Sequence, residues 1–260
     1  MANTLRLKQP TLYVGTDMIR AVPRDAGLQT LLQRDATPAS EHHFAPADPI
    51  QLATALTEAI HALSTASRHM QVVLSDVHCR YLTVPRPAGL QRADELTHFL
   101  HARFGAVYDN QQGDWQLTHH AAPSANVDLV VGARANVLAA LTRAASFCKV
   151  TLASIQPEWV CWHTQWQKTL QRGHHWLISG DGNWATIGYM ADGQCVSCRS
   201  IRLQPDHDWL GLVARHQTLV PESSTDALVW LGGRDAAPMQ DALHTLGERL
   251  QRGISPWSPA

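Results

Sequence analysis

A strand–turn–strand pattern occurs twice in this chain, and no other feature constrains the fold as strongly. In the first copy, apolar runs at 11–15 and 18–22 flank Thr16-Asp17 and predict a β-hairpin. The second copy begins after Gly173 and predicts a three-stranded meander whose second turn is Asp192-Gly193. Its predicted strands are 175–179, 185–190 and 196–203. Two such hairpins in one chain indicate a duplicated architecture.

Helix and strand patterns alternate between the two copies. Asp48-Pro49 supplies an N-cap and a first-turn proline for a helix whose apolar side chains, from Leu52 to Leu63, recur at helical spacing. The polar, Pro-containing run 35–47 predicts a loop. Further strands are predicted around 28–33, 71–75, 80–84, 106–108, 115–118, 127–132, 150–155 and 227–231, and further helices around 96–104, 137–145, 158–170, 209–219 and 239–250.

The repeated order, a hairpin followed by α/β units, is the outline of an α/β fold of the actin-like (ribonuclease H-like) kind with duplicated lobes. The first lobe is predicted to span 1–172, with an inserted α/β subdomain at about 86–156. A second, reduced lobe is predicted at 173–260.

The composition excludes several classes of function. Charged residues make up 17% of the chain, and 21 Lys+Arg against 22 Asp+Glu give a net charge of -1. This balance gives no electrostatic reason to bind nucleic acid or anionic lipid in bulk. The chain also lacks a Walker A loop, a dinucleotide fingerprint and a Gly-x-Ser-x-Gly nucleophile elbow. Enzymes that carry these signatures are therefore excluded.

Chain ends and cysteines indicate the compartment. The start of the sequence has no apolar signal-peptide core, and no stretch approaches the ~20 apolar residues of a membrane span. Five irregularly spaced cysteines are typical of reduced thiols. We therefore expect a cytoplasmic protein without direct membrane insertion. Cys195 and Cys198 have metal or redox spacing, but residues three apart on a strand point to opposite faces, so we expect two small buried side chains.

Histidine is unusually frequent, with 15 in the chain. Three adjacent pairs lie in or beside predicted loops, where solvated side chains explain them better than a metal site does. They are His42-His43, His119-His120 and His174-His175. His98 and His101 are one turn apart on a predicted helix. No metal is expected.

Three tryptophans, Trp159, Trp162 and Trp166, recur at helical spacing. Two interpretations fit this spacing. The side chains either pack into the core or form an exposed aromatic patch for a partner, since Trp is enriched at interface hot spots. The sequence leaves both open.

Several segments resemble the pilus-assembly protein PilM. Tyr13–Val22 resembles its first phosphate hairpin, Trp176–Gly193 matches its second without a gap, and Leu228–Pro238 is similar to its adenosine turn. Val127–Ala145 and Val150–Glu158 resemble the part inserted in the first lobe of PilM and of the cytoplasmic part of the secretion protein GspL. The resemblance implies an actin-like fold in which two hairpins hold nucleotide phosphates.

The resemblance also assigns the residues of a nucleotide site. Glycines let backbone N–H groups approach phosphate oxygens, and an Asp at each hairpin organises Mg²⁺. The matching positions here are Gly15, Thr16, Asp17, Asp181, Gly182, Asn183, Gly232 and Gly233.

The chain departs from the family at the positions that handle Mg²⁺ and phosphate. Tyr13 and Ser179 stand where the two metal-organising Asp residues are expected. Asp181 replaces a glycine and would repel a phosphate unless Mg²⁺ lay between them. The chain also runs from the helix predicted at 209–219 almost directly to 227, without the subdomain that walls the cleft of PilM-like ATPases. These departures predict a degenerate site, no cofactor and a pseudo-ATPase, not an enzyme.

The family then implies a function in binding. The chain is expected to be a cytoplasmic scaffold of a type IV pilus or type II secretion platform, held at the inner membrane through a partner. It would bind the cytoplasmic tail of a bitopic, PilN-like protein through the surface of residues 1–85 and connect it to the motor ATPase. Dimerisation is left open. The alternative is an ATP-binding ATPase or kinase that uses Asp17 and Asp181 as relocated Mg²⁺ ligands.

Overall fold

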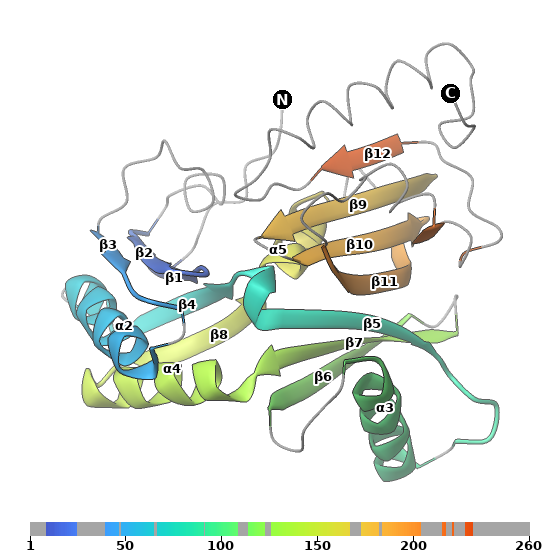
Figure 1. The fold of residues 1–260 in the computed structure, drawn as a ribbon, viewed down its shortest axis with the longest axis horizontal. Coiled ribbons are helices and arrows are strands. Elements are labelled where there is room, and N and C mark those ends of the chain that lie inside the picture. The colour runs from blue at the N-terminus through green and yellow to red at the C-terminus, as the bar shows by residue number, and fades with distance from the viewer. Residues whose placement is uncertain are drawn as a thin grey trace. The chain divides into compact units, whose positions relative to one another are not determined.

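The computed structural model describes residues 9–24, 40–46, 48–64, 67–90, 92–108, 114–122, 126–166, 173–181, 184–203, 215–216, 220 and 227–230 (Figure 1). For residues 122, 165, 166, 181 and 227–230 it describes the backbone alone. The chain divides into two compact units. Unit 1 comprises 1–79, 105–118 and 132–165, and unit 2 comprises 80–104, 119–131 and 166–260.

Unit 1 is built on a five-stranded sheet with the order β3-β2-β1-β4-β8. β1 pairs antiparallel with β2, which pairs antiparallel with β3, whereas β1, β4 and β8 are parallel. The strands are β1 (Thr11–Val14), β2 (Met18–Val22), β3 (Ser40–His43), β4 (His69–Leu74) and β8 (Thr151–Pro157). Every residue of β1 and β2 is buried, including Arg20 of β2.

Two helices of unit 1 lie side by side, α2 (Pro49–Ser64) and α4 (Ala135–Phe147) (Figure 1). Asp48 caps α2 as predicted, since its Oδ1 accepts hydrogen bonds from the N–H groups of Ile50 (2.8 Å) and Gln51 (3.1 Å). The predicted apolar face of α2 is buried. A third helix, α5 (Glu158–Trp166), follows β8 directly, and a short 3₁₀ turn (Asp76–His78) follows β4.

Unit 2 contains most of a seven-stranded sheet with the order β12-β9-β10-β11-β5-β7-β6. The predicted meander is confirmed, because β9, β10 and β11 pair antiparallel in sequence and Asp192 (φ 47°) and Gly193 (φ 77°) form the tight turn. The strands of this sheet are β9 (His174–Asp181), β10 (Trp184–Ala191), β11 (Gln194–Arg202), β12 (Ala227–Trp230), β5 (Cys79–Pro85), β7 (Val127–Arg134) and β6 (Trp115–Ala122). Most of the helix α3 (Ala93–Tyr108) also belongs to unit 2.

The same strand topology occurs in both units. In unit 1, β1-β2-β3 is an antiparallel meander and β4 lies parallel on the other side of β1. In unit 2, β9-β10-β11 is an antiparallel meander and β12 lies parallel on the other side of β9. The duplicated architecture predicted from the two hairpins is therefore present in the strand order.

Two sequence predictions about local structure are wrong. The predicted loop 35–47 contains β3, which pairs with β2 and is fixed there by an ion pair between Arg20 and Glu41 (2.8 Å). An edge strand with one exposed side tolerates polar side chains, so its composition resembles a loop. The predicted strand 106–108 is the last turn of α3, which continues past Gly105 because Leu100 and Phe104 anchor it one turn earlier.

The predicted orientation of Cys195 and Cys198 is also wrong. The register between β10 and β11 shifts at Tyr189/Met190, so Cys195 lies opposite Met190 and Cys198 opposite Gly188. The β-bulge inserts one extra residue, which puts both cysteines on the same face of the sheet. Both side chains are buried and neither forms a disulfide, as expected of small core residues.

Several predicted elements lie wholly or partly outside the described residues. The strand at 28–33 and the helix at 239–250 are outside them entirely, as is the end of the helix predicted at 158–170. Of the helix at 209–219, only 215–216 is described, and it is helical. The lobe limits 1–172 and 173–260, with the subdomain at 86–156, stay a prediction, because the compact units group segments by contact and not by sequence order.

Within the described part of the chain, no helix combines the length and the apolar character that a membrane span requires.

Candidate functional site

The first candidate phosphate turn is a tight hairpin whose own backbone groups pair with each other. Val14 pairs with Ile19, and the N–H of Gly15 donates to the carbonyl of Met18 (2.8 Å), which leaves Thr16-Asp17 as a two-residue loop. The carbonyl of Gly15 contacts Nε2 of His78 (2.8 Å). The amide that a phosphate-binding glycine offers to its ligand is thus used inside the turn.

Packing gives Gly15 a structural reason to be glycine. A Cβ at this position would lie 3.2 Å from Cε1 of Tyr13 and 3.3 Å from the carbonyl oxygen of Met18. Both distances are shorter than ordinary van der Waals contact. The close approach of the Tyr13 ring accounts for the glycine without a nucleotide.

Tyr13, which replaces the expected metal-organising Asp, donates its hydroxyl proton to Oε2 of Glu158 (2.9 Å). Both side chains are buried, Tyr13 in β1 and Glu158 at the start of α5. Because β1 and β8 run parallel on either side of β4, the end of β1 and the residue after β8 meet at the same edge of the sheet. A neutral phenol paired to a carboxylate thus occupies the place where the family resemblance expects a metal ligand.

A second buried carboxylate, Asp76, lies at the same edge. It follows β4, and its Oδ1 accepts a hydrogen bond from the backbone N–H of Trp159 (3.2 Å), which satisfies a donor in the first turn of α5. The pKa of the Cys161 thiol is raised to about 12, first by burial and then by the negative charges of Glu158 and Asp76. Both carboxylates at this edge therefore accept hydrogen bonds from groups of the protein, Glu158 from Tyr13 and Asp76 from Trp159.

The second and third candidate positions are described less fully. Asp181 ends β9 opposite Trp184, and between them lie Gly182 and Asn183, which are outside the described residues. Ser179, in place of the second expected Asp, is buried in β9 opposite Thr186. Gly232 and Gly233 follow β12 and are also outside the described residues. The structure therefore places Gly15, Thr16 and Asp17 together in unit 1, and Asp181 in unit 2.

A groove of about 610 Å³ opens on unit 1 along α2 and α4. Its apolar lining includes Phe44, Leu52, Val137 and Ala140, and its charged lining includes Asp114, Arg134 and Arg143. On α4 the lining positions 136, 139, 140 and 143 follow the i, i+3, i+4, i+7 spacing of one helix face. The resemblance indicated residues 1–85 as the partner-binding surface, but the groove is also lined by residues from 114 to 143.

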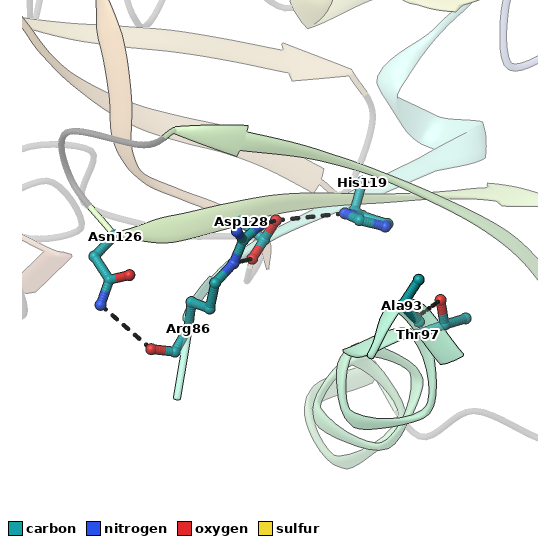
Figure 2. A network of polar contacts seen from close by, with 6 residues as sticks. All are labelled: Arg86, Ala93, Thr97, His119, Asn126 and Asp128. Atoms are coloured by element: carbon teal, nitrogen blue, oxygen red, sulfur yellow. Dashed lines mark hydrogen bonds and ion pairs between the residues drawn. The ribbon is translucent and has the colours of Figure 1, made fainter. Parts of the chain in front are cut away.

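Unit 2 carries a polar network that Figure 2 shows from close by. Arg86 binds the fully buried carboxylate of Asp128 through two hydrogen bonds (2.8 and 2.6 Å), and His119 Nδ1 lies 3.4 Å from the same carboxylate. The backbone of Arg86 also pairs with Asn126. The hydrogen bonds from Arg86 lower the pKa of Asp128 and outweigh the opposing effect of burial. The network links Arg86, the residue after β5, to His119 in β6 and Asp128 in β7.

The histidines are more ordered than the loops predicted for them. His42-His43 lie in β3, His119-His120 in β6 and His174-His175 in β9. His98 is exposed, and its Nδ1 lies 2.9 Å from the carbonyl of Asp94. His216 packs edge-on against Trp176 (5.6 Å), and its pKa is lowered by burial to about 4. Over the described residues, no three His, Cys, Asp or Glu side chains are grouped to hold a metal.

Two of the three spaced tryptophans are core residues. Trp159 is fully buried and Trp162 nearly so, and the ring of Trp159 stacks on His163 at 5.8 Å. These two do not form an exposed patch, which favours the core-packing interpretation.

The chain has an actin-like α/β fold. It aligns over 98% of its length with 91% of a Bacteroides thetaiotaomicron protein described as having an actin-like ATPase fold and unknown function (12% identity, TM-score 0.61). The suspected PilM and GspL likeness is present at the level of structure. The chain aligns over 97% of its length with 90% of a chain from a PilM-PilN type IV pilus biogenesis complex (12% identity, TM-score 0.58).

A third similar structure is the cytoplasmic domain of EpsL, an inner membrane component of the type II secretion system of Vibrio cholerae. The alignment covers 85% of this chain and 81% of that one, with 15% identity and a TM-score of 0.50. Neither a protein-family model nor a curated protein sequence matches the chain. At identities this low, the structural similarity establishes the shared fold alone.

Sequence reasoning missed the partners of the substituted positions. Nothing in the sequence joins Tyr13 to Glu158, which lie 145 positions apart. One signal for the groove was present, since Asn136, Ala139 and Arg143 form a polar or small-residue stripe at the i, i+3, i+7 spacing of one face of α4.

Proposed function

We propose that this chain is a non-catalytic scaffold of a type IV pilus or type II secretion inner-membrane platform. It works in the cytoplasm, where it binds the tail of a bitopic membrane protein and connects that protein to a motor ATPase. The proposal draws on the structural similarity to PilM in its complex with PilN and to the cytoplasmic domain of EpsL.

The observation that carries the non-catalytic part is the internal pairing at the first hairpin. Gly15 donates its N–H to Met18, and Tyr13 donates its hydroxyl to Glu158. A phosphate bound here would need free amides and a Mg²⁺ ion held by carboxylates. Binding it at this turn would require breaking buried hydrogen bonds, one of which involves a charged group and is worth about 1.5–3 kcal/mol.

The binding part rests on the groove along α2 and α4. Most of its apolar lining residues are buried, whereas Arg134, Arg143 and Asp114 are partly or fully exposed, which suits an extended peptide with apolar anchors. The proposed occupant is the cytoplasmic tail of the membrane partner. Arg134 is held in place because its guanidinium lies over the ring of Trp115, 4.2 Å from the centroid.

The test is a binding measurement with the cytoplasmic tails of PilN-like, single-span membrane proteins from the same organism, made as labelled peptides. We expect micromolar affinity in fluorescence anisotropy. Ala139→Glu places a charged side chain on the exposed helix face that lines the groove and should weaken binding at least tenfold.

Thr142→Glu is the matched control, because it adds the same charge on an exposed position of α4 that does not line the groove. Equal losses in both variants, or no binding by the unmodified chain, would contradict the proposal.

The second candidate function is an ATP-dependent ATPase or kinase that uses Asp17 and Asp181. The observation that favours it is the strand pairing around both positions, since Val14 pairs with Ile19 and Asp181 pairs with Trp184. Saturable binding of Mg-ATP distinguishes it from the scaffold.

A further inference from the structure

An exposed aromatic side chain with basic residues close to it in sequence lies at the end of α4 in unit 1. Phe147 is 79% exposed, one of two large hydrophobic side chains exposed among the described residues. Arg143 lies one turn earlier on the same helix, and Lys149 follows two residues later. Both are exposed.

A third cation, Arg68, lies just before β4 and contacts the end of α4. The guanidinium of Arg68 lies 3.3 Å from the carbonyl of Cys148 and 3.5 Å from that of Lys149, and donates to both. The N–H of Thr151 donates to the carbonyl of Arg68 (2.8 Å), which fixes the two segments side by side. We call Phe147, Arg68, Arg143 and Lys149 the basic patch.

The basic patch has no acidic counterpart nearby in the sequence. The segments 61–69 and 141–151, which build it, contain these three cations and two histidines but no Asp or Glu. Among the described residues, none of the three cations forms an ion pair with a carboxylate. These two segments therefore carry positive charge alone, while Arg143 also lines the groove that contains Asp48 and Asp114.

The backbone at Lys149 is in a conformation that favours glycine. Helix α4 ends in a Schellman motif, in which Val150 N–H donates to Ala145 (2.9 Å) and Lys149 N–H to Ser146 (3.1 Å). The residue at the left-handed position is Lys149, with φ 54°. A lysine at a position where glycine is less strained points to a use for its side chain.

We propose that the basic patch is a peripheral docking surface for an anionic lipid membrane, with Phe147 entering the interface and the three cations contacting phosphate headgroups. The inference rests on the proposed function, which brings the chain to the inner membrane through the tail of its partner. Aromatic and basic residues together are the usual composition of such interfacial contacts.

Shape distinguishes a membrane from an acidic protein as the occupant. Phe147 stands exposed at the tip of a helix, so a protein partner would need a matching pocket for it. A lipid interface accepts a protruding aromatic side chain without one. One chain with three cations binds weakly by itself, and tethering by the partner's tail raises the local concentration at the membrane.

The experiment is co-sedimentation of the full chain with vesicles of phosphatidylethanolamine and phosphatidylglycerol, compared with neutral phosphatidylcholine vesicles. We expect binding to the anionic vesicles that falls with added salt, and little binding to the neutral ones. Each cation near an anionic surface contributes about fivefold to partitioning, so Lys149→Gly should weaken binding about fivefold. Phe147→Ala should weaken it about tenfold, and Phe147→Trp should restore it.

Two controls separate the proposal from loss of folding and from general hydrophobicity. Lys149→Gly removes the charge while relieving backbone strain, so its weaker binding cannot be due to unfolding. Ile50→Ala removes the second large hydrophobic side chain that is exposed among the described residues. Ile50 is 76% exposed in the first turn of α2, and its removal should leave vesicle binding unchanged.

No binding to anionic vesicles at low salt, or equal binding by Lys149→Gly and the unmodified chain, overturns the proposal. Binding to an acidic peptide but not to vesicles overturns it as well and assigns the patch to a protein. The tail-peptide assay on the same preparations separates the two proposals. If the tail binds but vesicles do not, only the patch proposal fails, and the reverse result rejects only the proposed tail binding.

Discussion

Removing the Tyr13 hydroxyl tests the internal pairing at the first hairpin. In Tyr13→Phe the buried carboxylate of Glu158 loses a donor at 2.9 Å while the aromatic ring stays in place. Hydrogen bonds to charged groups contribute about 1.5–3 kcal/mol, so we expect the free energy of unfolding to fall by about 2 kcal/mol. For a chain of this length, that corresponds to a decrease in Tm of about 4–8 °C.

Urea unfolding of four proteins measures this coupling: the unmodified chain, Tyr13→Phe, Glu158→Ala and the double variant. If the hydroxyl acts through Glu158, Tyr13→Phe costs about 2 kcal/mol in the unmodified chain and little in the Glu158→Ala background. An equal cost in both backgrounds, or a cost below about 0.5 kcal/mol in the unmodified chain, refutes the pairing as the reason for the substituted site.

Three further predictions follow from single side chains. Lys149→Gly should raise the free energy of unfolding by about 0.5–1 kcal/mol, since the left-handed conformation costs a non-glycine residue about 1–2 kcal/mol and the helix dipole returns up to about 1 kcal/mol; a thermal melt checks this. Because the pKa of Asp128 is lowered in the folded state, its contribution to stability is present above about pH 4 and is lost as pH falls through the folded-state pKa. The free energy of unfolding, measured against pH, should therefore fall less steeply in acid for Asp128→Asn than for the unmodified chain. Alkylation at pH 8 followed by mass spectrometry should modify half-buried Cys148 before Cys161, whose thiol is buried and has a pKa of about 12; preferential labelling of Cys161 would contradict the structure around α5.

The regular part of the fold could be predicted from sequence because its signals are local. The β1–β2 hairpin and the α2 cap at Asp48 depend on residues within a few positions of one another, and both are where the patterns put them. The strand β3 could not be predicted, because it forms through pairing with β2 and the ion pair of Arg20 with Glu41. The bulge that turns Cys195 and Cys198 to one face likewise depends on the register with β10.

The candidate site divides in the same way. The sequence identified Tyr13 as a departure from the family pattern, but only the fold gives its partner, Glu158, and the role of Asp76 at α5. The groove and the basic patch also join distant segments, since Leu52 lies with Val137 in one and Arg68 with Lys149 in the other. Contacts of this kind depend on the sheet order, which residue patterns alone do not determine.

Calorimetric titration of the full chain with Mg-ATP tests the central claim, that the chain is a binding scaffold without a working nucleotide site. The account predicts no saturable heat up to millimolar Mg-ATP, from a preparation that binds the tail peptide. Micromolar binding of Mg-ATP that Gly232→Arg abolishes would contradict the account and establish the ATPase or kinase alternative.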